Sequence, residues 1–224
     1  SLNVTAGGAV TDSGTLAITG ATTISASGQD ITLSDGSSTF GTLVLTGANV
    51  AVTEAAATDL GASTVSGTLG ITSTGAVTDS GTLAVTGATT ISASGQDITL
   101  SESASTFGTI SVTGANVAIT EAAATELGAS TVSGTLGITS TGAITDSGTL
   151  AITGDATFTN SGGTDEAITL DDSGNVFTGS VTFATDSGSA VTIVDTTALD
   201  LVALSAASLN VTAGGAVTDS GTLA

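Results

Sequence analysis

The sequence predicts an all-β solenoid, in which short strands coil into stacked turns around an aliphatic core. Three observations support this fold class: the chain repeats itself, its apolar residues alternate with small polar ones in short runs, and its 224 residues include no proline. Alternation with a period of two is typical of strands with one buried face. The lack of proline leaves every strand N–H able to pair with a neighbouring turn.

The repetition has two levels. The letters GAVTDSGTLA stand at residues 8–17, 75–84 and 215–224, and at 142–151 with Ile144 in place of valine. Residues 15–81 and 82–148 are matching blocks of 67 residues, and residues 149–221 form a diverged block of 73. Residues 208–224 then copy residues 1–17 letter for letter. We therefore interpret the chain as one 207-residue super-repeat plus the start of the next, within a longer array.

Each block divides into three phrases, which we interpret as coils of one continuous solenoid domain spanning residues 1–224. The predicted coils are residues 15–41, 42–63, 64–81, 82–108, 109–130, 131–148, 149–179, 180–203 and 204–221. This gives about nine coils per super-repeat, and stacking is what buries their shared apolar face. A string of small β-sandwiches fits less well, because no Trp or Tyr fills a core. A left-handed hexapeptide helix would need uniform 18-residue coils.

Local patterns predict details of the coils. We expect glycine, at 31 positions, to supply corners with positive φ, and EAAATDL at residues 54–60 is compatible with one helical turn. Val44 and Thr32 each stand between two residues expected in the core, so the alternation of a strand predicts that their side chains point outward. Val44 is replaced by Ser111 in the second block, in agreement with an outward position. The residues expected in the core are Leu16, Ile18, Ile31, Leu33, Leu43, Leu45, Val50 and Val52.

Composition excludes several functions. The chain has 20 carboxylates, no Lys, Arg or His, and a net charge of −20, so it cannot grip phosphates or a nucleic-acid backbone. No apolar run approaches the roughly 18 residues of a membrane span. Without Cys and His there is no disulfide framework, thiolate zinc site, or Ser–His–Asp or Cys–His catalysis. We expect no enzyme, no nucleic-acid partner and no membrane insertion.

The acidic residues fall into three groups. The first group, Asp12, Asp79, Asp146 and Asp219 in TDSG with Asp30 and Asp97 in GQD, is predicted to bond backbone N–H groups at corners; calcium ligation is the alternative. The second group is expected to form a solvated acidic stripe and comprises Glu54, Asp59, Glu121, Glu126, Asp195 and Asp200. The third group occurs once per super-repeat and provides candidate calcium ligands, with an exposed loop as the alternative: Asp165, Glu166, Asp171 and Asp172.

Two further residue types recur. Outward threonines suggest either an ice-binding ladder or simply the polar face of ordinary strands; they are Thr19, Thr32, Thr46, Thr72, Thr86, Thr99 and Thr113. Phe40, Phe107 and Phe177 each close a long coil, and we expect them to plug its corner.

Three phrases carry a family resemblance. GQDITLSDGSSTFG, LTGANVAVTEAAATDLGAS and GAVTDSGTLAVTG resemble repeats of filamentous-haemagglutinin-type proteins, the large exoproteins of bacterial two-partner secretion. The resemblance covers essentially the whole chain, although the lack of Lys and Arg departs from that family. It implies a right-handed parallel β-helix, export through an outer-membrane secretion pore, and an extracellular or cell-surface location.

The function we expect is structural. The chain would be a repeat segment of a secreted bacterial extracellular fibre or matrix filament that self-associates along or between filaments. The alternative is the stalk of a large surface adhesin whose binding module lies outside this segment. An S-layer-like lattice and an ice-binding protein are less favoured, and calcium is the one cofactor that the sequence suggests.

Overall fold

The computed structural model describes residues 1–163, 165–185, 188–204 and 206–223, and its regular structure is all β-strand. The strands form two sheets, A and B, in which neighbouring strands run parallel. Residues 54–60 are not helical: β6 (Val50–Glu54) ends at Glu54, and β7 (Thr58–Leu60) begins four residues later. The all-β prediction is therefore confirmed, and the suggested helical turn is wrong.

Each sheet holds 14 strands. Sheet A contains β1 (Leu2–Thr5), β3 (Thr22–Ser25), β5 (Thr42–Gly47), β7 (Thr58–Leu60), β8 (Ser63–Val65), β10 (Val77–Asp79), β11 (Leu83–Val85), β13 (Ile98–Leu100), β15 (Val117–Glu121), β18 (Leu136–Ser140), β21 (Ala156–Asn160), β24 (Ser180–Ala184), β26 (Leu199–Leu204) and β28 (Val217–Leu223). Sheet B contains β2 (Val10–Thr11), β4 (Ile31–Leu33), β6 (Val50–Glu54), β9 (Leu69–Ser73), β12 (Thr89–Ser92), β14 (Thr109–Gly114), β16 (Thr125–Leu127), β17 (Ser130–Val132), β19 (Ile144–Asp146), β20 (Leu150–Ile152), β22 (Ile168–Leu170), β23 (Val176–Phe177), β25 (Ala190–Asp195) and β27 (Ser208–Ala213).

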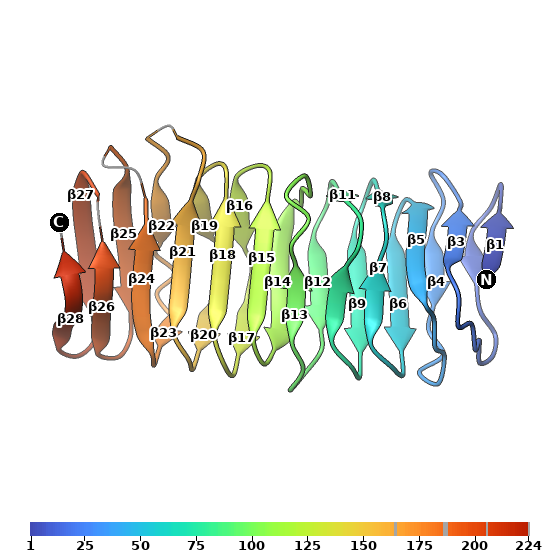
Figure 1. Cartoon of the computed structure of the whole chain (residues 1–224), viewed down its shortest axis with the longest axis horizontal. Helices are drawn as coiled ribbons and strands as arrows, with labels where there is room; N and C mark the ends of the chain where they lie inside the picture. The colour runs from blue at the N-terminus through green and yellow to red at the C-terminus, as the bar shows by residue number, and fades with distance from the viewer. Residues whose placement is uncertain (164, 186–187, 205, 224) are drawn as a thin grey trace.

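The chain alternates between the sheets and makes about 11 turns. In Figure 1 the front strands of sheet A point upward, the strands of sheet B behind them point downward, and the chain advances from right to left. Rotation and advance are thus related as in a right-handed screw. The structure confirms the right-handed parallel β-solenoid.

The number of turns per block differs from the prediction. From β3 the chain passes through β4, β5, β6, the β7–β8 pair, β9 and the β10–β11 pair before it reaches β12, the counterpart of β3 one block later. Seven passes make three and a half turns, so β3 lies in sheet A and β12 in sheet B. The identical segments in β1 and β27 also lie in opposite sheets. The super-repeat therefore makes ten and a half turns rather than nine, because phrases of 27 residues hold more than one turn.

The core follows the predicted parity. Six of the eight expected core residues, Ile31, Leu33, Leu43, Leu45, Val50 and Val52, are at most 2% exposed. Leu16 and Ile18 are half-buried because they lie in the first turns, whereas their counterparts one block later, Leu83 and Val85, are buried. Val44 and Thr32 alternate with buried neighbours and face outward, as predicted.

Phenylalanine fills the core at both expected and unexpected positions. Phe40, Phe107 and Phe177 are buried, in agreement with the corner-plug prediction. In the third block Phe158 packs edge-on against Phe177, with ring centroids 6.2 Å apart, and stacks on Phe183 at 5.8 Å. These rings fill the interior where the turn from Ala156 to Val181 lengthens to 25 residues.

At many positions glycine allows the backbones of adjacent turns to lie close together. Among the described residues only Gly28, Gly95 and Gly163 have positive φ, so the predicted role holds at three positions. Gly87 stacks on the preceding turn, and its N–H donates to the carbonyl oxygen of Gly67 at 2.9 Å. A Cβ atom on Gly87 would lie 2.5 Å from that oxygen. Glycine is needed here because a side chain would push stacked turns apart.

Candidate functional site

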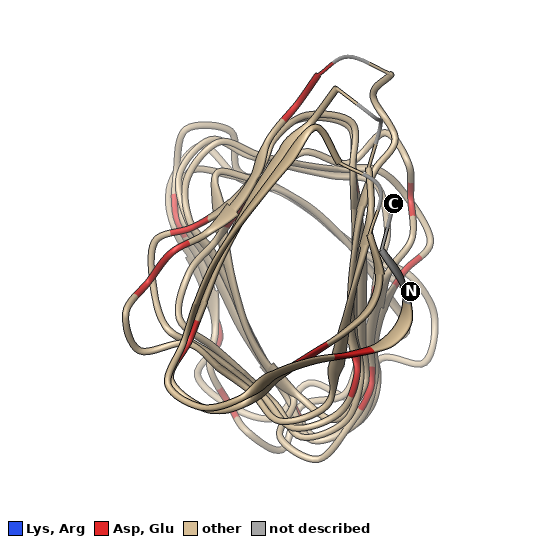
Figure 2. Ribbon diagram, turned by 90° about the vertical axis from the view of Figure 1, so that its left-hand side faces the viewer, with Lys and Arg blue, Asp and Glu red and all other residues tan. Residues whose placement is uncertain are grey.

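Carboxylates are the only ionisable side chains of this protein, and Figure 2 shows them distributed around the wall of the coil. Because no cationic side chain is present, their charge must be stabilised by neutral donors or by solvent. The polar groups that recur from turn to turn are therefore the candidate functional features.

The aspartates of the TDSG motif bridge successive turns. Asp12 accepts the backbone N–H groups of Ser34 and Asp35, with N···O distances of 2.9 and 3.1 Å. One block later Asp79 accepts those of Ser101 and Glu102 at 2.8 and 3.1 Å. The predicted corner role is confirmed for these aspartates.

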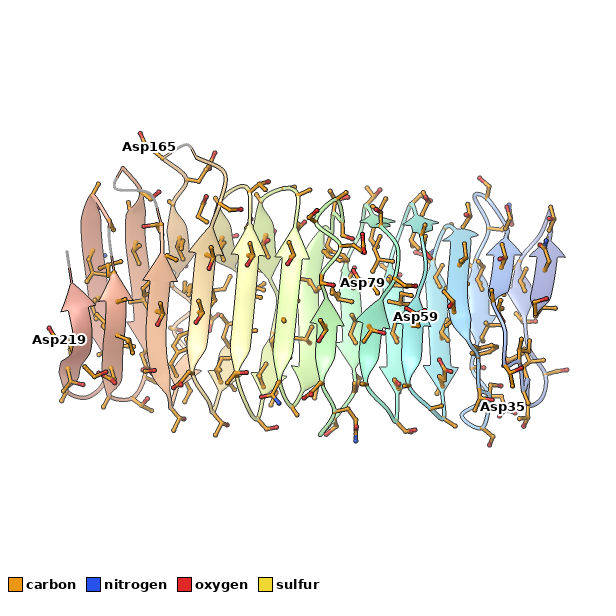
Figure 3. The ribbon with its side chains drawn as sticks, viewed as in Figure 1. Asp35, Asp59, Asp79, Asp165 and Asp219 are labelled. Atoms are coloured by element: carbon orange, nitrogen blue, oxygen red, sulfur yellow. The ribbon has the colours of Figure 1, made fainter. Side chains whose placement is uncertain are left out.

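The third and fourth aspartates of this motif differ in their surroundings. Asp146 accepts the N–H of Asp171 at 2.9 Å and is also bonded by the side-chain amide of Asn175. Asp219 is exposed on β28, the last strand (Figure 3). The bridge thus forms wherever a following turn supplies N–H groups.

The aspartates of the GQD motif begin a ladder along the corner. Asp30 accepts the backbone N–H of Asn49 at 3.1 Å and its side-chain amide at 2.9 Å. Asn49 in turn accepts the N–H of Thr68 at 3.1 Å, so three turns are linked. Asp97 begins the same ladder in the second block. These aspartates also have the predicted corner role.

Half of the predicted acidic stripe faces outward. Asp59 accepts the hydroxyl groups of Thr42 and Ser80, on the preceding and following turns, at 2.8 and 2.9 Å. Glu126 accepts the hydroxyl of Thr109, and Asp200 that of Ser220 at 2.7 Å. Glu126 is exposed, Asp59 and Asp200 are half-buried, and all three carboxylates tie neighbouring turns together.

The other half is buried, so the stripe prediction is wrong for Glu54, Glu121 and Asp195. Their exposed fractions are 0, 0 and 1%. The reason is the alternation of side-chain direction along β6. Val50, Val52 and Glu54 are every second residue of this strand, and all three side chains point into the core. This alternation was readable in the sequence, but the charge of the side chain argued against burial.

Each buried glutamate joins a phenylalanine to a threonine. Oε1 of Glu54 accepts the backbone N–H of Phe40 at 2.7 Å, and Oε2 accepts the hydroxyl of Thr58 at 2.8 Å. Glu121 repeats this arrangement with Phe107 and Thr125, at 2.8 Å each. The carboxylate thereby satisfies two polar groups that would otherwise be buried without partners.

Asp195 occupies the corresponding place in the third block with a shorter side chain. Its Oδ1 accepts the N–H of Phe177 at 3.3 Å and both donors of Thr197, at 3.0 and 2.9 Å. Its Oδ2 is buried and has no hydrogen-bond partner. The aspartate therefore satisfies the phenylalanine N–H less well than glutamate does.

Burial sets the direction of most of the pKa shifts. Desolvation raises the pKa of Glu54 and Glu121 above its ordinary value, and their two hydrogen bonds offset only part of this effect. Desolvation also raises the pKa of Asp146, with a smaller contribution from the charge of Asp171. The pKa of exposed Asp155 is lowered because Ser180 donates its N–H and its hydroxyl to it.

The candidate calcium ligands do not converge. Asp165 is exposed on a loop that projects from the coil (Figure 3), and the half-buried Glu166 follows it. Asp171 and Asp172 follow β22, and Asp172 accepts the N–H of Gly174 and the hydroxyl of Thr149. Nowhere in the described part of the chain do three or more acidic side chains form a group that could hold a metal ion. Calcium binding stays a prediction from sequence alone.

The surface offers little enclosure. A groove of about 370 Å³ runs over stacked corners and is lined by Gly87, Gly108 and Glu126 among others. Its carboxylate, on Glu126, already accepts a hydroxyl group. The described residues contain no helix that could cross a membrane.

The comparisons with known proteins identify the repeat. A family model described as "Repeats of unknown function (DUF5649)" matches residues 1–46, 47–113, 114–184 and 188–224. No curated protein matches the chain, and no solved structure does. The match supports a repeat protein, whereas the resemblance to the filamentous-haemagglutinin family gains no support and stays a prediction.

Proposed function

Because the chain belongs to this family of repeats of unknown function and winds into a continuous β-solenoid, we propose that it is a structural segment of a secreted bacterial extracellular fibre or matrix filament. The observation behind the proposal is that the described turns are joined by parallel strand pairing along both sheets, with register shifts in the β24–β26 and β26–β28 pairs. Backbone ladders pair turn with turn, and carboxylates bridge the corners. Such a rod needs only repetition to extend.

The dimensions suit a shaft. About 11 turns at about 4.8 Å per turn give a rod about 50 Å long, and each block of three and a half turns adds about 17 Å. Blocks alternate between faces, so an outward feature of one block reappears on the opposite side in the next. A shaft built this way presents the same chemistry on both sides.

The charge suits an extended extracellular material. With a net charge of −20, neighbouring rods repel at low ionic strength and approach one another when salt or divalent cations screen them. Self-association along or between filaments would then depend on the ionic medium. We assign the chain no catalytic role, since the chemistry of one block recurs in the next and the groove over the corners holds a carboxylate that is already bonded.

Electron microscopy of cells that produce this chain tests the proposal. Gold-labelled antibodies raised against residues 1–224 should label extracellular filaments along their whole length. Deleting residues 82–148, one complete block, should shorten the axial repeat by about 17 Å for each block removed. Label confined to the cell interior would overturn the proposal. Label on short stalks with unlabelled tips would favour the adhesin alternative.

A further inference from the structure

The outward faces of the two sheets contain areas without a carboxylate. On sheet B, strand pairing aligns the outward residues of β4, β6, β9, β12 and β14 in two columns. We call this area patch B, and it consists of Thr32, Ala51, Thr53, Gly70, Thr72, Thr90, Ser92, Ser111 and Thr113. Beyond β14, the next turn of this sheet carries Glu126 on β16. Patch B is therefore a neutral area in a molecule with a net charge of −20.

The second block repeats this area on the opposite sheet (Figure 1). The outward residues of β13, β15, β18, β21 and β24 again form two columns without a carboxylate. We call this area patch A, and it consists of Thr99, Ala118, Thr120, Gly137, Thr139, Thr157, Thr159, Thr182 and Ala184. Because a block makes three and a half turns, the two patches lie on opposite sides of the rod.

Small residues make each patch shallow near its centre. In patch A, Ala118 pairs with Gly137 on the next turn. A hollow of about 240 Å³ lies over them, and Asp155 also lines it. In patch B, Ala51 pairs with Gly70 in the same way. An approaching surface can therefore place larger side chains, such as threonine, over these positions.

The hydroxyl groups of both patches are unused within the described part of the chain. No hydrogen bond between described residues involves a threonine or serine side chain of either patch, including Thr72 and Thr139. Hydroxyl groups outside the patches are used, since those of Thr42 and Ser80 donate to Asp59. The patches can therefore bond to a partner without breaking a bond inside the solenoid.

We infer that these patches dock face to face on the patches of a second copy of this chain. The inference rests on the proposed structural function and specifies where neighbouring rods touch. Two copies with a net charge of −20 each repel where carboxylates meet, and contact through the patches keeps the carboxylates apart. Their strands also have the same spacing of about 4.8 Å, so the columns of two rods can interdigitate along their length.

The size of a patch makes one contact weak and many contacts strong. Five strands cover about 24 Å along the axis, and two columns cover about 12 Å across it, which gives about 300 Å² for each copy. A standard stable interface buries about 800 Å² for each partner. In a longer array, patches on both sides of the rod would act together and gain avidity. The rods would then associate side by side into layers.

Cysteine variants test the contact on the full 224-residue chain, which has no native cysteine. Thr72→Cys and Thr139→Cys place thiols at corresponding positions of patches B and A, and Ser103→Cys places one at an exposed corner outside both. Oxidation with copper phenanthroline in about 0.5 M NaCl, which screens repulsion, should link the patch variants, alone or mixed, about tenfold faster than Ser103→Cys. Adding Thr90→Glu to Thr72→Cys should slow linkage about tenfold relative to adding Ser103→Glu, which brings the same charge outside the patch.

Circular dichroism checks that each variant is folded. Equal linkage rates for patch and corner thiols, or folded Thr90→Glu and Ser103→Glu variants that link equally fast, would overturn the inference. The patches would then be left to another occupant, such as ordered water at an ice surface, which thermal hysteresis detects. If dimers fail to form while antibodies label extracellular filaments, the proposed function stands and the lateral contact is refuted. Dimers formed by a chain that labels only the cell interior would support the contact and refute the function.

Discussion

Replacing the buried carboxylate of Glu121 with an amide should stabilise the protein at neutral pH. The Glu121 side chain is fully buried at the end of β15 and receives two hydrogen bonds from neutral donors. Glu121→Gln keeps the size of the side chain and an acceptor for the N–H of Phe107, and the hydroxyl of Thr125 can turn to accept from the new amide. The substitution removes the free-energy cost of burying a charged group. That cost is also why desolvation raises the pKa of Glu121.

The sign of the pH dependence follows from that raised pKa. A carboxyl group with a higher pKa in the folded state binds its proton more tightly there than in the unfolded chain. Its contribution to stability is therefore fully present below the unfolded value of 4.5, declines as pH rises through the folded value, and is constant above it. Each unit by which the pKa is raised corresponds to about 1.4 kcal/mol of stability lost at neutral pH. Glu121→Gln should recover the stability that the charged carboxylate loses at neutral pH, and its free energy of unfolding should depend less on pH.

The truncated variant should behave in the opposite way. Glu121→Ala leaves the buried N–H of Phe107 and the hydroxyl of Thr125 without a partner. Each unsatisfied group costs about 1–3 kcal/mol, so the loss should be about 2–6 kcal/mol at pH 4, and it should be smaller at pH 7, where burial of the charge already destabilises the unmodified chain. Glu126→Gln, five residues further on and exposed, is the matched control and should change stability by less than about 0.5 kcal/mol.

Urea unfolding followed by far-ultraviolet circular dichroism between pH 4 and 8 measures these differences, since the chain has no Trp or Tyr for fluorescence. Amide exchange at Phe107 adds a local measurement, with protection kept in Glu121→Gln and reduced in Glu121→Ala. A Glu121→Gln variant that is less stable than the unmodified chain at pH 7, or whose pH profile keeps the original slope, would show that burial of this charge does not destabilise the protein.

The remaining predictions concern stacking, register and charge. Gly87→Ala should cost about 1–3 kcal/mol, because its Cβ would meet the carbonyl oxygen of Gly67, whereas Gly70→Ala, with its nearest such atom 3.8 Å away, should be tolerated; urea midpoints compare the two. Leu45→Ser should cost about 3–5 kcal/mol by removing a buried side chain, and Val44→Ser less than about 0.5 kcal/mol; equal losses would refute the register. Melting temperature should rise on acidification from pH 7 toward 4.5, since desolvation raises the pKa values of Glu54, Glu121 and Asp146. Calorimetry in Ca²⁺ and in Na⁺ at equal ionic strength distinguishes a bound ion from screening, and equal melting temperatures would contradict a calcium site.

The sequence by itself determined the class of fold and the inward or outward direction of most strand residues. Alternation of large and small residues has a period of two, which is the geometry of a strand, so Leu43, Val44 and Leu45 could be assigned to opposite faces without a structure. The recurrence of Asp12 and Asp79 before Ser-Gly likewise indicated a corner, because short carboxylates bond nearby N–H groups there.

Only the tertiary structure decided how the phrases wind into turns and what the exceptions do. The alternating pattern predicts which side chains face the core, but strands of both sheets have the same pattern. It therefore cannot show that β3 and β12 lie in opposite sheets. Whether a corner closes a turn depends on which strands then pair, and that pairing is between residues about 20 positions apart, such as Leu2 and Thr22. The burial of Glu121 depends on the same stacking, because the N–H of Phe107, 14 residues earlier, reaches its carboxylate only once the turns are in register, whereas the hydroxyl of Thr125 is only four residues away.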